Sequence, residues 1–117
     1  MSERERPADE PAPESALVGA RVMDESGALI GRALGVLRDE RTDALAFVSV
    51  RDGMLYGRRH LVPLAAAEIG YERIDVPYRR ARVMGSPSFE AGRRILPEEE
   101  AAVCAHYGLA SPTPWLE

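Results

Sequence analysis

The stretch Ala44-Leu-Ala-Phe-Val-Ser-Val50 is apolar at every position except Ser49. Its apolar side chains alternate onto both faces, which is typical of a strand covered on both sides. Polar turn sequences flank it, with Asp39-Glu-Arg-Thr-Asp43 before it and Arg51-Asp-Gly53 after it. The sequence therefore predicts that residues 44–50 form a strand at the centre of the hydrophobic core.

Two further apolar segments precede this strand. Residues 17–24 place their apolar side chains mostly on one parity, as a half-buried strand does. Residues 28–37 are apolar but are interrupted by Gly31 and Gly35. Those glycines would weaken a helix, whereas a curved and bulged strand accepts them. We therefore expect a second strand over 28–37, joined to the first by a tight turn.

The segments that follow are also short. Residues 53–63 carry an apolar run, a basic triplet and a strand that ends at Pro63, which cannot donate to a ladder. Residues 65–69 have helical propensity but are too few for a helix, and 73–78 alternate as a final strand. Five or six short strands without intervening crossover helices predict a mainly β domain, a small antiparallel barrel.

The C-terminal part has a different pattern. Residues 79–90 form a connection with prolines and glycines, and a helix begins at Pro97, which suits the first helical position before three glutamates. Gly108 can adopt the left-handed conformation that ends a helix and lets Leu109 contact Cys104. So short a helix must dock on the barrel or on another chain. The expected docking residues are Val103, Cys104 and Tyr107.

These patterns divide the chain of 117 residues into four parts. Residues 1–15 are charged and rich in proline, so we expect a disordered tail. Residues 16–84 are the barrel, 85–109 are a linker and the helix, and 110–117 are a tail with the single tryptophan, Trp115.

Composition narrows the functional classes. The formal net charge is -4, which gives no overall electrostatic reason for nucleic-acid binding. The single cysteine, Cys104, can form no intramolecular disulfide, which indicates a reducing compartment. Neither a signal peptide nor a membrane span is apparent, so we expect a cytoplasmic protein.

Several short motifs occur along the chain in an order that is typical of a known family. They are Leu17-Val-Gly with Val22 and Asp24; Gly27 with Ile30-Gly31; Asp39 to Asp43 before an apolar strand; Gly53-Met-Leu-Tyr-Gly-Arg-Arg-His-Leu-Val-Pro63; Val76-Pro-Tyr78; and Ser86-Pro87 before a helix ending in His106-Tyr-Gly-Leu109. This order resembles the PRC-barrel family, which includes the barrels of the reaction-centre H subunit and of a ribosome maturation factor. The resemblance implies a binding and assembly module without catalytic residues. Neither the membrane helix of the former nor the preceding barrel of the latter is apparent in this sequence, so we do not expect electron-transfer support or ribosome assembly to follow from the resemblance alone.

No residue pattern predicts catalysis or cofactor binding. Cys104 and His106 are two apart in the expected helix and point to different sides, so we expect a buried structural cysteine. His60, between Arg59 and Leu61, is expected to be structural or at the surface. The acidic turn with Glu40 lacks the calcium-loop spacing, and no phosphate-binding or zinc-protease motif occurs. We therefore expect no enzyme, no metal and no cofactor.

The remaining candidates are interaction residues. Six are basic, namely Arg58, Arg59, His60, Arg79, Arg80 and Arg82, and two are aromatic, Tyr107 and Trp115. The basic set can be an internally salt-bridged surface, a protein interface or a phosphate-binding patch. Trp115 can dock on its own molecule or on a neighbour. We expect a non-catalytic protein-interaction module that self-associates as a homodimer, with an unidentified protein partner; the alternative is an RNA- or ribosome-associated factor using the arginines.

Overall fold

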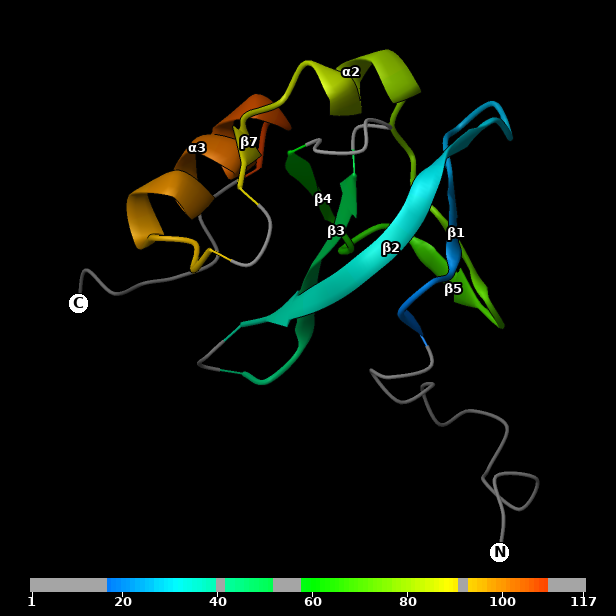
Figure 1. Cartoon of the computed structure of the whole chain (residues 1–117), viewed down its shortest axis with the longest axis horizontal. Coiled ribbons are helices and arrows are strands. Elements are labelled where there is room, and N and C mark those ends of the chain that lie inside the picture. Colours follow the sequence, from blue (N-terminus) through cyan, green and yellow to red (C-terminus); the bar gives the residue numbers. More distant parts are fainter. Residues whose placement is uncertain (1–16, 40–41, 52–57, 91–92, 110–117) are drawn as a thin grey trace, which may run out of the picture.

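Seven strands form one mixed sheet in the computed structural model, which describes residues 17–39, 42–51, 58–90 and 93–109 (Figure 1). The strands are β1 (Arg21–Met23), β2 (Leu29–Arg38), β3 (Leu45–Arg51), β4 (Arg59–Pro63), β5 (Glu68–Gly70), β6 (Arg73–Asp75) and β7 (Ser88–Phe89). The helices are α2 (Arg80–Met84) and α3 (Pro97–His106). Their order across the sheet is β5-β6-β1-β2-β3-β4-β7. The mainly β prediction is confirmed.

Strand β2 joins two groups of strands. Its first part pairs with β1 over residues 29–32, and its later part pairs with β3. The register shifts between Ala33 and Gly35, which is the bulge that the glycines predicted. In Figure 1, β2 runs as a long diagonal with β1 and β5 on one side and β3 and β4 on the other. The bulge lets one strand serve both groups.

The topology differs from the expected antiparallel barrel in three respects. The described residues form seven strands rather than five or six, and β1 pairs with β6 in parallel. This parallel pair aligns Val22 with Ile74, two fully buried side chains. Their burial on one face of the sheet favours the parallel pairing, although short strands more often pair in antiparallel fashion. The sheet order begins at β5 and ends at β7, so the strands that the structure describes do not close on themselves.

Short elements were harder to predict. Residues 68–70 form β5, a strand that the sequence did not predict, and the strand expected over 73–78 ends at Asp75. The connection expected over 79–90 contains α2 and β7, which are held by tertiary contacts. The tails 1–15 and 110–117 lie outside the described residues.

The predicted central strand is the centre of the core. Phe47, Val48 and Val50 of β3 are buried on alternating faces, as the apolar pattern of both parities predicted. Pro63 lies at the end of β4, where its missing N–H costs least. Buried side chains from β1, β4, β6, α2 and α3 complete a single cluster.

Helix α3 docks on its own chain through Val103, Cys104 and the adjacent Tyr107, all buried. Its end has the predicted geometry, because Gly108 has φ 73° and the Leu109 N–H donates to the Cys104 carbonyl at 2.8 Å. Within the described ranges, no helix is long and apolar enough to cross a membrane.

Gly108→Ala is expected to lower the free energy of unfolding by about 1 kcal/mol, because an alanine is strained in the left-handed region. No atom lies within 4 Å of the added Cβ, so the cost is conformational alone. Gly70→Ala is the matched control, since its Cβ would make an ordinary 3.7 Å contact at an unstrained φ. Urea unfolding measures both, and equal stabilities would contradict the prediction.

Asp24 ties the β1–β2 turn to α2. Its Oδ1 accepts hydrogen bonds from the Ser26 N–H, the Ser26 hydroxyl and the Ala28 N–H at 2.7–3.0 Å. Its Oδ2 accepts from the Arg80 N–H at 3.0 Å, at the start of α2. These hydrogen bonds hold the pKa of Asp24 well below its ordinary value of 3.8, and the bond from the Ser26 hydroxyl has the largest effect. The carboxylate therefore joins two segments that are far apart in the sequence.

Asp24→Asn is expected to lower the melting temperature at pH 7, because an amide nitrogen would face the Arg80 N–H. A depressed native pKa stabilises the fold above the unfolded pKa, and that contribution is lost as pH falls through the native pKa. The difference in melting temperature between wild type and variant should thus be constant above about pH 5 and shrink below about pH 4. A difference independent of pH would contradict this account.

Candidate functional site

The three basic residues at the start of β4, Arg58, Arg59 and His60, have different surroundings. Arg58, immediately before the strand, donates from Nε to the Ser88 hydroxyl at 2.8 Å and from Nη2 to the Ser88 carbonyl at 2.9 Å. Arg59 is half-buried and donates from Nη2 to the Arg93 carbonyl. His60 is buried. Each member of the triplet thus has a different intramolecular role.

His60 is held by α2 and the turn that follows it. The Ser86 hydroxyl donates to the Val83 carbonyl at 2.6 Å, so its oxygen accepts from His60 Nδ1 at 3.0 Å. This arrangement assigns the proton to Nδ1. The prediction of a structural histidine agrees with this buried network, in which β4 and α2 are joined by polar contacts.

The arginines around α2 are likewise engaged or dispersed. Arg79 pairs with Glu25 at 2.9 Å, and Arg80 is exposed. The Arg82 guanidinium lies over the rings of Tyr78 and Tyr107, 5.5 and 5.6 Å from their centroids. A cation over two aromatic faces is stabilised in place. The six basic candidates therefore do not present one common set of free guanidinium groups.

Tyr107 belongs to the core of the chain. Its ring packs against Tyr78 with centroids 4.6 Å apart, and burial raises its pKa to about 12. The side chain is therefore not available as an exposed anchor in this structure. The second aromatic candidate, Trp115, lies outside the described residues.

Cys104 and His106 do not form a nucleophile and base pair. Cys104 is buried, and burial raises the pKa of its thiol. His106 Nε2 donates to the Arg82 carbonyl at 2.8 Å instead. Of the acidic turn, Glu40 lies outside the described residues, and Asp39 accepts from the Thr42 N–H. The part of the chain that the structure describes holds no group of three histidines, cysteines or carboxylates able to bind a metal.

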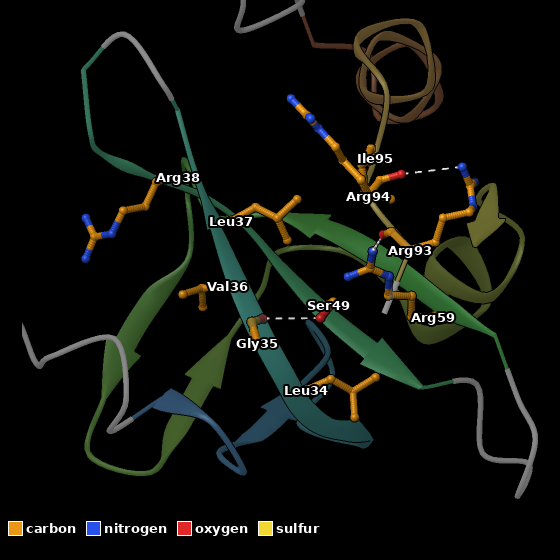
Figure 2. A pocket seen from close by; sticks show the side chains of 10 residues that line it. All are labelled: Leu34, Gly35, Val36, Leu37, Arg38, Ser49, Arg59, Arg93, Arg94 and Ile95. Atoms are coloured by element: carbon orange, nitrogen blue, oxygen red, sulfur yellow. Dashed lines mark hydrogen bonds between the residues drawn. The ribbon is translucent and has the colours of Figure 1, made fainter. Parts of the chain in front are cut away.

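A groove of about 610 Å³ lies over the sheet between the end of β2 and the segment 93–95 (Figure 2). Its lining combines apolar side chains with four arginines: Leu34, Gly35, Val36, Leu37, Arg38, Ser49, Arg59, Arg93, Arg94 and Ile95. Among the described residues that line it there is no carboxylate, although the chain as a whole is acidic. The described lining of this groove therefore combines a concave surface with several positively charged side chains.

Sequence reasoning found only Arg59 among these four arginines. Arg38 belongs to β2 and points to the other side of that strand from Arg59, whereas Arg93 and Arg94 belong to the segment 93–95, which lies far from β2 in the sequence. The adjacent basic pair Arg93-Arg94 before Ile95 was the available signal. Its proximity to β2 could not be read from the sequence.

The positive charges of Arg93 and Arg59 are compensated to different extents. Arg93 is bound by Glu99, with Nη2 and Oε2 2.8 Å apart, which lowers the pKa of that carboxyl. Arg59 has no such ion pair among the described residues, and its buried Nε has no acceptor there. The pKa of Arg59 is lowered mainly by burial and, to a smaller extent, by the nearby positive charge of Arg93. Arg59 is a cation held beside another cation without its own carboxylate.

A second groove of about 310 Å³ is lined mainly by apolar groups from β3, β4 and the end of α3, including Phe47, Pro63, Cys104 and Leu109. A separate exposed apolar set lies near β5: Ile69 is 40% and Tyr71 is 84% exposed. Tyr71 precedes Glu72, a non-glycine residue with φ 61° in the turn to β6. The molecule therefore has hydrophobic surface outside the arginine-lined groove.

No protein-family model matches the chain, and a comparison with curated proteins finds no significant match.

Ser86→Ala is expected to lower the free energy of unfolding by roughly 1–3 kcal/mol, because the buried His60 Nδ1–H loses its acceptor. Ser88→Ala is the control, since it removes a bond to the exposed Arg58 and should change stability by about 0.5 kcal/mol or less. Chemical denaturation at pH 8 measures both. Equal losses in the two variants would contradict a structural role of the His60 network.

Proposed function

We propose that this protein is a non-catalytic protein-interaction module of the PRC-barrel type that associates with a second copy of itself. The observation that carries this proposal is the edge strand β5, whose three residues are all exposed. It is flanked by the exposed apolar side chain of Tyr71. Unpaired strand edges are templates for pairing with another chain.

The two edges of the sheet differ in how they are protected. At β7, a strand of two residues, Arg58 already occupies the carbonyl of Ser88. At β5 the outer side has no partner strand among the described residues, and Ile69 is only partly covered by pairing with Ile74 of β6. Charged or capped edges discourage association, whereas β5 offers an apolar centre. The open edge is therefore β5.

A two-fold antiparallel pairing of β5 suits its residues. Centred on Ile69, it would place Ile69 against Ile69 of the second copy and Glu68 against Gly70. Opposed like charges are thereby avoided, and an isologous contact closes as a dimer. Tyr71 would lie at the rim, where an aromatic residue gains contact area at low entropic cost.

The family and compartment are part of the same proposal. The bulged β2, which serves two strand groups, is compatible with a small barrel, and the motif order gives the PRC-barrel resemblance. The buried thiol of Cys104 suits the cytoplasm. The intramolecular contacts of Arg58, Arg79 and Arg82 favour a protein-interaction module over the RNA-binding alternative.

Ile69→Asp is expected to raise the dissociation constant of the dimer by at least about tenfold, because each copy loses a buried apolar contact and gains opposed carboxylates. Light scattering across a concentration series, in 0.1 M and 1 M salt, measures the mass. The control is Leu96→Asp, which changes an exposed apolar residue before α3 by the same charge.

Two results would contradict the proposal. A wild-type monomer at all concentrations would exclude self-association, and equal weakening by the two variants would exclude β5 as its site. Nuclease-sensitive mass that falls steeply with salt would instead favour the RNA-binding alternative, because phosphate contacts release counterions.

A further inference from the structure

The groove between β2 and the segment 93–95 has two chemically different walls. Leu34 and Leu37 point to the side of β2 on which Arg59 lies, whereas Val36 and Arg38 point to the other side (Figure 2). Across from them, Ile95 follows the two arginines of the segment 93–95. Partly buried aliphatic side chains, such as Leu37 and Ile95, therefore form the floor of the groove, and arginine guanidinium groups lie at its end.

The arginines of this groove differ in how far their charge is compensated. Arg93 is neutralised by Glu99 in a two-pronged pair with distances of 3.3 and 2.8 Å. Arg59 and Arg94 have no carboxylate partner among the described residues. A buried cation without a counter-ion is costly, so an unpaired half-buried arginine beside another arginine requires compensation from outside.

The position of Arg59 is nevertheless well defined. Its Nη2 donates to the Arg93 carbonyl, and its strand, β4, lies between β3 and β7. The guanidinium is thus held in place before any ligand arrives. Preorganised donors bind with a smaller entropic loss than mobile surface side chains do.

From these contacts we infer that the groove binds a small organic anion, whose phosphate or carboxylate group is held by Arg59 and Arg94 and whose apolar body lies on Leu34, Leu37 and Ile95. Guanidinium forks match the paired oxygens of either oxyanion. The volume of about 610 Å³ is within the range of small-molecule sites. This site is separate from the β5 edge and does not depend on self-association.

Isothermal titration calorimetry on the full chain tests the site with four probes: phenyl phosphate, benzoate, inorganic phosphate and the neutral benzyl alcohol. We expect one phenyl phosphate or benzoate per chain, weaker binding of inorganic phosphate, and none of benzyl alcohol. The tighter of the two aromatic anions identifies the oxyanion that the groove prefers. Affinity should fall as salt rises.

Arg94→Gln is expected to weaken binding of the preferred anion by roughly tenfold, the effect of losing one charge-assisted hydrogen bond. Arg80→Gln is the matched control, an exposed arginine outside the groove with the same change in charge. Arg59→Lys keeps the charge but loses the fork, so it should also weaken binding. Its fold is checked by melting temperature, and Arg94→Gln carries the test if that variant is unstable.

Three results would overturn the inference. Neither aromatic anion binds at millimolar concentration, or benzyl alcohol binds as tightly as they do, or Arg80→Gln weakens binding as much as Arg94→Gln does. The dimer mass of Arg94→Gln should equal that of wild type, which separates this site from the proposed function.

Discussion

The rest of the structure depends on the bulge in β2 between Ala33 and Gly35. Because β2 pairs with β1 over residues 29–32 and with β3 over residues 33–38, two groups of strands share one core. A straight strand would extend a flat sheet and leave an apolar face uncovered. In the resulting sheet β5 lies at one edge, and the later part of β2 lines a groove together with the segment 93–95.

Polar contacts then place the short elements that the strands cannot hold by themselves. Asp24 accepts the Arg80 N–H at the start of α2, and Ser86 at its end bonds to His60 of β4. A helix of five residues is too short to be stable alone, so these contacts with the sheet are what maintain it. They also keep Arg82 over its two tyrosines, away from the arginine-lined groove.

The two surfaces of interest have different physical character. The β5 edge offers backbone groups and two apolar side chains, which suits a flat protein contact. The groove offers charge around a concave apolar floor, which suits a small ligand. Since the groove contains Arg94 and the edge contains Ile69, substitutions can alter either one without touching the other.

The sequence by itself determined the elements whose signals are local. The apolar parity of residues 44–50, the glycines at 31 and 35, and the end signals at Pro97 and Gly108 predicted β3, the bulge and α3, because each depends on neighbouring residues alone. Tertiary structure alone decided the parallel pairing of β1 with β6, the existence of α2 and β7, and the meeting of Arg59 with Arg93 and Arg94. Those features join residues far apart in the chain, and their free energy comes from contacts that no local pattern encodes.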